Sequence, residues 1–369
     1  MEHKPVFRPS FGNRPEYLIG RDDVLEQLIE GISNYPGSAG RATLIVGQRG
    51  MGKTALLLEL AERAQKLDFV VARVTCGEFM LDNMVELLQK SGDRYIREPK
   101  SPVKGFSAGA FGFSVGLTFT EEAQRSFGFR VKLEMIIDRL SKVGKHVLLL
   151  VDEVNPSVVQ MREMAAAYQE LAGNEADVSI VMAGLPSSIS DILNYRTLTF
   201  LNRAQRISLG LIAVTEVELY YIGAFKRAGI TVSMDIVKKA AAFTNGFPYL
   251  IQLIGYYIVR LAEQGKPVDE ELLNRAEALA SEEMDIKVFQ AMLNPLSEQD
   301  RNFLAAMSED DGVTKVADLE KRTGFSHGML QTYRKRLIEA GVIFSPRRGE
   351  LAMIMPQLVD YLRRMEKGE

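Results

Sequence analysis

Eight residues near position 50 have the composition of a phosphate-binding loop. Residues 47–54 read GQRGMGKT and satisfy the pattern G-x-x-x-x-G-K-[ST]. The glycines let main-chain N–H groups point inward at phosphate oxygens, the lysine reaches the β- and γ-phosphates, and the threonine hydroxyl can bind Mg²⁺. An apolar run precedes the loop and a helical pattern follows it, as the motif requires. We therefore predict a magnesium–ATP site whose nucleotide-binding residues are Gly47, Gln48, Arg49, Gly50, Met51, Gly52, Lys53, Thr54 and Ala55.

Two adjacent carboxylates, Asp152 and Glu153, follow a second aliphatic run at residues 147–151. In ATPases with such a phosphate-binding loop, an aspartate in that position holds Mg²⁺, usually through water. A neighbouring glutamate can orient and activate the attacking water. The alternative is that both carboxylates only cap the next helix, but their place at the end of a buried strand favours the catalytic roles. We expect Thr54 and Asp152 to hold the metal, and Lys53 and Glu153 to serve catalysis.

The elements that must position these residues alternate between strands and helices. Apolar runs predict strands at residues 42–46, 69–75, 147–151, 178–183 and 205–209, with helical patterns between them. This alternation is typical of an α/β fold with a parallel sheet covered on both faces. After residue 211 the pattern is purely helical, at residues 215–228, 233–244, 248–264 and 269–293. We predict an N-terminal arm (1–17), a nucleotide-binding core (18–211), a helical lid (212–294) and a C-terminal domain (295–369).

An unusual Gly- and Phe-rich segment, KGFSAGAFGFSVGLTF, occupies residues 104–119. Large apolar residues alternate there with small ones, which predicts a β-hairpin inserted within residues 100–120. The hairpin would be either a flap that packs on the core or an element that touches DNA or a neighbouring subunit.

With these motifs placed, the chain resembles the AAA+ ATPases. The resemblance is to the branch that holds the replication-initiator (Orc-like) ATPases and the bacterial and archaeal AAA ATPases related to the STAND signalling ATPases. Residues 18–21, LIGR, resemble that family's "hhGR" box beside the adenine, and residues 244–248, TNGFP, resemble the "GxP" motif of its lid. Arg203 falls where the family often has an arginine finger. The resemblance implies that the nucleotide site also includes Ile19, Gly20, Arg21 and Pro248.

Two residues that the family often directs at the γ-phosphate are missing from this chain. The start of the third lid helix reads Pro248-Tyr249-Leu250, without an arginine, and the fourth strand ends in Met182-Ala183-Gly184, without a polar residue. The resemblance thus implies slow hydrolysis or a nucleotide switch.

Residues 296–365 read as a winged helix-turn-helix. The proposed third helix and the wing carry most of its positive charge: residues 321–348 hold seven lysines and arginines and one acidic residue. In winged-helix proteins these elements meet duplex DNA, with cations on the phosphates. The alternative is a module that makes protein contacts only. We predict that the DNA-contacting residues are Arg334, Lys335, Arg336, Arg347 and Arg348.

Composition limits the remaining possibilities. A net charge of −3 over 369 residues excludes a protein that is basic throughout, so DNA binding must come from a local patch. A single cysteine, Cys76, excludes intrachain disulfides, and no apolar run is long enough to span a membrane, so we expect a cytoplasmic protein. The sequence predicts an ATPase or nucleotide switch that binds double-stranded DNA and can form homo-oligomers. The alternative is a STAND-like signalling ATPase whose winged helix regulates the nucleotide state without DNA. A metabolic kinase is disfavoured, because nothing resembles a small-substrate site.

Overall fold

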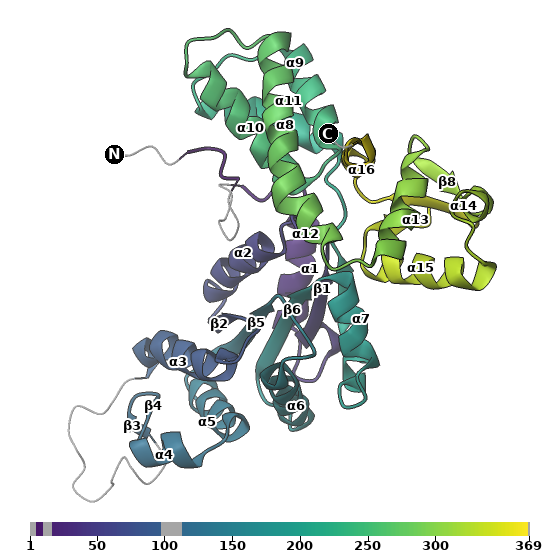
Figure 1. The fold of residues 1–369 in the computed structure, drawn as a ribbon. Coiled ribbons are helices and arrows are strands. Elements are labelled where there is room, and N and C mark those ends of the chain that lie inside the picture. Colours follow the sequence, from purple (N-terminus) through teal and green to yellow (C-terminus); the bar gives the residue numbers. More distant parts are fainter. Residues whose placement is uncertain (1–4, 10–16, 97–112, 368–369) are drawn as a thin grey trace, which may run out of the picture.

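The computed structural model describes residues 5–9, 17–96 and 113–367. A central sheet carries helices on both faces, the helical lid lies at one end of it, and the C-terminal module lies beside the lid and the sheet (Figure 1). Within the described residues, no helix is both long and apolar enough to cross a membrane.

The central sheet has five parallel strands in the order β2-β5-β6-β1-β7. All five strands predicted from the sequence are confirmed. Their bounds are β1 Ala42–Val46, β2 Phe69–Thr75, β5 His146–Asp152, β6 Val178–Gly184 and β7 Gln205–Ser208. Every residue of β5 after His146 is buried, which explains its unbroken aliphatic sequence. Because the strands are parallel, the loops that follow β1, β5 and β6 meet at one edge of the sheet.

The two faces of the sheet pack against different helices. Leu148 and Leu150 of β5 point toward α1 and α2, whereas Leu149 and Val151 point toward the opposite face, as the two-residue period of a strand requires. On the first face lie α1 Asp22–Ser33 and α2 Lys53–Gln65. The second face is covered by α3 Met80–Gly92, α5 Phe129–Ser141, α6 Val159–Gly173 and α7 Pro186–Asn194.

The inserted segment is described only from residue 113 onward. There β3 Phe113–Val115 and β4 Thr118–Phe119 form a two-stranded antiparallel hairpin, with Phe113 stacked on Phe119 at 4.6 Å between ring centroids. The earlier part of the predicted hairpin, residues 104–112, lies outside the described residues. After the hairpin the chain forms two helices, α4 Glu121–Ser126 and α5, which are separate because the chain is extended at Gly128.

The lid is helical, as predicted. Its helices are α8 Val214–Arg227, α9 Met234–Thr244, α10 Pro248–Ala262 and α11 Glu270–Met284, and a π-helical stretch, Asp285–Phe289, joins α11 to α12 Gln290–Leu293. Its apolar residues share one core with α1 and α2. The lid therefore packs on the face of the sheet from which the phosphate-binding loop leads into α2.

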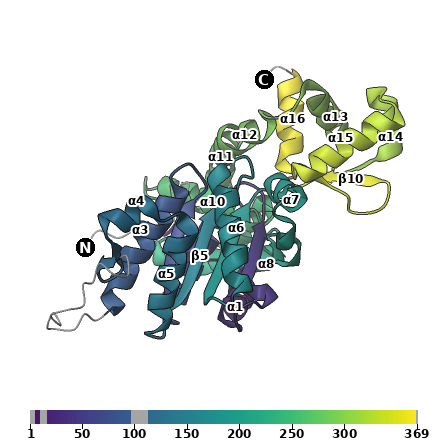
Figure 2. The ribbon, with the colours of Figure 1, turned by 90° about the horizontal axis from the view of Figure 1, so that it is seen from below.

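The C-terminal module combines helices with a three-stranded antiparallel sheet of order β8-β10-β9. It lies next to α7 (Figure 2). The strand β8 was not predicted from the sequence, because its three residues alternate too briefly to show a period. The elements are α13 Glu298–Ser308, β8 Val313–Lys315, α14 Val316–Thr323, α15 His327–Glu339, β9 Ile343–Phe344, β10 Glu350–Met353 and α16 Gln357–Lys367.

Gly246, just before α10, lies against Ile212 in the segment that leads from β7 into α8. Its φ is +73°, and its carbonyl oxygen accepts a hydrogen bond of 2.8 Å from the Ile212 N–H. A Cβ added at Gly246 would lie 1.8 Å from the Ile212 carbonyl oxygen. Only glycine therefore permits this approach of the two backbones.

We expect Gly246→Ala to destabilise the protein strongly. Gly229→Ala is the matched control, because Gly229 has the same φ of +73° but no atom within 4 Å of the added Cβ. The control should lower the free energy of unfolding by about 1 kcal/mol, the cost of the left-handed backbone. Gly246→Ala should lose a further ~1–3 kcal/mol, because its added Cβ collides with the Ile212 carbonyl oxygen. Chemical denaturation measures both; equal losses would show that the close approach does not matter.

Candidate nucleotide-binding site

The predicted phosphate-binding loop connects the end of β1 to the start of α2. Gly50 and Gly52 have φ of +78° and +83°, a region that other residues rarely adopt. Lys53 is the first residue of α2, so the helix directs the positive end of its dipole at the loop. Main-chain N–H groups and the helix end therefore form a binding place for phosphate oxygens.

The Lys53 ammonium lies inside this loop. Its Nζ donates hydrogen bonds to the carbonyl oxygens of Gly47 at 2.7 Å and Gln48 at 2.8 Å. Burial lowers the pKa of Lys53 to about 8, an effect that Asp152 and Glu153 oppose and Arg49 reinforces. A cation held by two carbonyls in a partly desolvated place is a strong partner for an anion.

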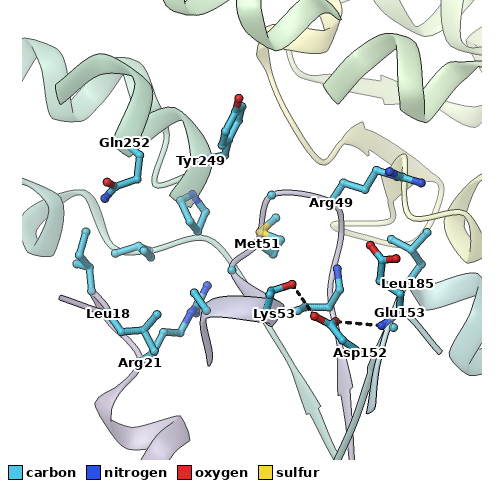
Figure 3. Close-up of a pocket in the computed structure, with 18 of the residues that line it drawn as sticks. Leu18, Arg21, Arg49, Met51, Lys53, Asp152, Glu153, Leu185, Tyr249 and Gln252 are labelled. Atoms are coloured by element: carbon cyan, nitrogen blue, oxygen red, sulfur yellow. Dashed lines mark hydrogen bonds between the residues drawn. The ribbon is translucent and has the colours of Figure 1, made fainter. Parts of the chain in front are cut away.

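Thr54 and Asp152 form an oxygen pair across the end of the sheet. The Thr54 hydroxyl donates a hydrogen bond of 2.6 Å to Asp152 Oδ2, and the Glu153 N–H donates one of 3.0 Å to Asp152 Oδ1 (Figure 3). Asp152 is buried, with 3% of its surface exposed. A hydroxyl and a carboxylate beside a phosphate site are the oxygen ligands that Mg²⁺ prefers, so these residues fit the predicted metal.

Glu153 has an unusual backbone. Its φ is +54°, in the left-handed region that costs a non-glycine residue about 1 kcal/mol or more. The side chain is exposed and lines the cleft, near Arg49 and Leu185 (Figure 3). This conformation turns the carboxylate out of the strand and toward the cleft, where it can reach a water molecule.

The cleft extends from the phosphate loop to an apolar end formed by the core and the lid. Its volume is about 380 Å³, and Leu18 lies on the side opposite Glu153 (Figure 3). Ile19 and Pro248 also line the cleft. Arg21 is 8% exposed and donates a hydrogen bond of 2.5 Å to the Gly210 carbonyl oxygen, so it mainly ties the "hhGR" segment to the core. Burial lowers the pKa of Arg21, whereas Glu216 acts in the opposite direction.

Of the predicted nucleotide residues, most line the cleft and a few only shape it. Gly20, Gly47 and Gln48 are not in its lining. Gly20 has a φ of +59° and lies close to Glu216 of α8, so it positions its neighbours. The predicted residues that do line the cleft are Ile19, Arg21, Arg49, Gly50, Met51, Gly52, Lys53, Thr54, Ala55, Asp152, Glu153 and Pro248.

The phosphate loop is contacted by the lid and by the C-terminal module. A Cβ on Gly50 would lie 2.6 Å from the Phe247 ring of the lid. A Cβ on Gly341, just after α15, would lie 1.3 Å from Gln48 Nε2. Gln48 is 5% exposed, and its Nε2 has no hydrogen-bond partner. The Gln48 side chain therefore points away from the cleft and fills a space that exists only because residue 341 is glycine.

The other predicted site residues lie away from the cleft. Arg203 is exposed at the end of a 3₁₀ helix, Thr199–Arg203, and is not among the residues that line the cleft. Arg336 forms an ion pair with Asp300, an acid with 1% of its surface exposed, and also donates a hydrogen bond to Ser297. Arg334 donates hydrogen bonds to Gln331 and Ser345.

Lys335, Arg347 and Arg348 are exposed. Lys335 has 78% of its side chain exposed and lies 3.8 Å from Glu339. The predicted basic face therefore divides into these three accessible cations and two arginines that bind neighbouring parts of the module.

Sequence reasoning missed several residues of the cleft. Leu18, Gly184 and Tyr249 lie within or beside family motifs, and Val154 and Asn155 directly follow Glu153. The others carry no local signal and reach the cleft only through tertiary packing. The missed residues are Arg8, Tyr17, Leu18, Val154, Asn155, Gly184, Leu185, Ser188, Ile212, Tyr249 and Gln252.

Comparison with known proteins agrees with this geometry. Residues 17–174 match the family model of the AAA ATPase domain, and residues 286–362 match a domain of unknown function (DUF8462). The Walker-type ATPase of Pyrococcus abyssi has a similar structure, with a TM-score of 0.68, 15% identity, and coverage of 98% of this chain and 99% of that chain. The Aeropyrum pernix ORC2 protein, solved in ADPNP–ADP complexes, gives a TM-score of 0.60 at 14% identity over 98% of each chain. At these identities the structural likeness shows the fold alone, and the family match identifies residues 17–174 as an AAA ATPase domain.

Proposed function

We propose that this protein is a magnesium-dependent ATPase, or slow nucleotide switch, that couples its nucleotide state to duplex DNA binding by a C-terminal winged helix. The observation that carries the proposal is the contact between Gln48 of the phosphate loop and Gly341 at the end of α15. A change in the loop on binding or losing phosphate would move the Gln48 side chain, which in turn would move α15.

The residues of the cleft divide the chemistry among them. Lys53 and the loop N–H groups bind the phosphates, and Arg49 brings a second cation to the same end of the cleft. Thr54 and Asp152 would hold Mg²⁺, which supplies charge neutralisation at the phosphates when it is bound. Glu153 would orient a water molecule and accept its proton.

Two residues that the family often directs at the γ-phosphate are absent from this chain, and their absence supports slow hydrolysis. β6 ends in Gly184, whose hydrogen side chain can make no contact with a phosphate, and α10 begins with Pro248 and Tyr249. Asn155 and Ser188 are polar residues of the cleft that could partly replace the missing groups. We propose that Arg203, exposed and outside the cleft, would act on the nucleotide of a neighbouring copy if the protein assembles into homo-oligomers.

The DNA contact is proposed for the accessible cations of the module, Lys335, Arg347 and Arg348. Arg336 is better explained as a structural residue, since it neutralises the buried Asp300 of the α13 capping box. The second candidate function is a signalling ATPase in which the module regulates the nucleotide state without DNA. The Gln48–Gly341 contact supports that candidate equally well, so DNA binding is the property that separates the two.

Glu153→Gln should separate ATP binding from turnover. The amide keeps the size of the side chain but cannot accept a proton, so hydrolysis should slow by about 10²-fold or more while ATP affinity stays within a few fold. Steady-state phosphate release and calorimetry measure the two quantities. Lys53→Ala is the contrasting variant and should lose ATP affinity itself. Equal turnover by wild type and Glu153→Gln would show that Glu153 is not the base.

The DNA proposal is tested by the salt dependence of binding to duplex DNA. Replacing Lys335, Arg347 and Arg348 together by alanine should make the slope of log affinity against log salt shallower by ~0.9 for each lost phosphate contact. Fluorescence anisotropy with a labelled duplex at several salt concentrations gives the slope. Lys266→Ala, at an exposed lysine of the lid, is the control and should leave it unchanged. A wild-type protein without duplex affinity at low salt would favour the signalling candidate.

Coupling itself is tested at Gln48. Gln48→Ala removes the side chain that fills the space at Gly341 and leaves the residues lining the cleft intact. The ratio of duplex affinities measured with ATP and with ADP should therefore move toward one, and by reciprocity DNA should lose its effect on ADP affinity. An unchanged ratio in Gln48→Ala would show that the two sites communicate by another route, or not at all.

A further inference from the structure

A short part of the N-terminal arm, residues 5–9, is docked on the lid at the apolar end of the cleft. Its anchor is Phe7, which has 3% of its surface exposed. The Phe7 ring centroid lies 5.8 Å from that of Tyr220, 6.0 Å from Tyr221 and 5.5 Å from Phe225, all on α8. Such an aromatic cluster holds the segment by burial and by edge-to-face contacts. We call residues 5–9 the docked arm.

The lid is shaped to receive this ring. Gly255 lies within α10, and a Cβ added there would be 2.1 Å from Phe7 Cε1. Glycine inside a helix costs about 1 kcal/mol relative to alanine. The helix thus contains an unfavourable residue at the one place where the Phe7 ring needs the space, and docking of the arm offsets that cost.

A second tie joins the docked arm to a residue of the cleft. The Arg8 N–H donates a hydrogen bond of 3.0 Å to Gln252 Oε1, and Gln252 Nε2 donates one of 3.2 Å to the Tyr220 hydroxyl. Gln252 is 8% exposed and lines the cleft. Arg8 is also among the residues that line the cleft, and its side-chain Nε donates a hydrogen bond of 3.0 Å to the Pro5 carbonyl oxygen within the docked arm. Both main-chain and side-chain contacts therefore fix the position of Arg8.

The position of Lys53 decides which part of a nucleotide would meet the docked arm. Lys53 and Asp152 mark the phosphate end, and Gln252 and Leu18 lie at the far side of the cleft from Glu153 (Figure 3). A nucleotide whose phosphates lie at Lys53 must place its base toward the end that Leu18, Gln252 and Arg8 line.

We propose that the docked arm is part of the nucleotide-binding site and that the Arg8 side chain covers the purine base. A guanidinium is planar and is attracted to the face of an aromatic ring, so it can stack on a purine of either kind. Phe7 and Gly255 are the positioning residues that hold Arg8 there. This inference rests on the proposed function, because it presupposes that the cleft binds a nucleotide.

The test is the rate at which fluorescently labelled ADP leaves the protein when it is chased with unlabelled ADP. Arg8→Ala removes the cover directly and leaves the main-chain tie to Gln252 in place. Gly255→Ala pushes the Phe7 ring out of its space without changing any residue that lines the cleft. Both variants should release ADP about tenfold faster, in keeping with the loss of one desolvated cation–aromatic contact.

Two controls make the result specific. Gly173→Ala, at the last residue of α6, adds a Cβ that meets no atom within 4 Å and should leave the rate unchanged. Pyrophosphate, which has no base, should bind all the variants with the affinity of the wild type. Equal weakening of pyrophosphate and ADP would overturn the proposal, since it would show a general disturbance of the cleft.

Unchanged ADP release in both Arg8→Ala and Gly255→Ala, from a protein that binds ADP, would also overturn the role of the docked arm. A wild-type protein that binds neither ADP nor pyrophosphate would instead refute the proposed function, and this inference with it. The two failures are therefore distinguishable in the same experiment.

Discussion

The loop between β1 and α2 is the point at which the parts of this chain meet, and the rest of the structure depends on how closely they approach it. Glycine at position 50 leaves room for the Phe247 ring of the lid, and glycine at position 341 leaves room for the Gln48 side chain. A phosphate-binding loop must already be rich in glycine so that its N–H groups can point inward. At Gly50 this lack of a side chain lets the lid touch the loop, whereas in the C-terminal module it is Gly341 that makes room for a side chain of the loop.

This arrangement has a consequence for how a nucleotide could influence the molecule. Side chains in a close-packed interior cannot shift independently, so a movement at one contact is passed on to its neighbours. Lys53 is close to both contacts, because its Nζ donates a hydrogen bond to the Gln48 carbonyl oxygen and Gly50, three residues earlier, packs against Phe247. The Nε2 of Gln48 has no hydrogen-bond partner, and a buried amide left unsatisfied costs free energy.

The cleft is built from residues far apart in the chain, and its two ends are assembled in different ways. The phosphate end uses a local motif and two strand ends, which parallel pairing brings to one edge of the sheet. The apolar end is formed by the "hhGR" segment, the start of α10 and the docked arm, so it is assembled from the core, the lid and the N-terminal arm. The Gly246 carbonyl oxygen accepts a hydrogen bond from the Ile212 N–H, which ties the start of α10 to the segment that leads into α8.

The sequence alone predicted the class of fold and located the candidate phosphate-binding loop and the two carboxylates beside it. The loop at residues 47–54, the carboxylates Asp152 and Glu153 and the five strands were all predictable, because each depends on neighbours in the chain or on a short period of apolar residues. Even the left-handed backbone of Gly52 follows from its place in the motif.

Only the tertiary structure decided which residues share a space. Gln48 belongs to the loop motif, yet its side chain contacts Gly341, and Arg336 looks like a free cation in the sequence but neutralises Asp300. Phe7 and Gly255 lie far apart in the chain, and no local pattern connects a ring in an arm with a glycine in a helix. The physical reason is that burial and charge pairing depend on contacts between distant segments, whereas a sequence pattern reports only what a residue's own strand, helix or loop requires.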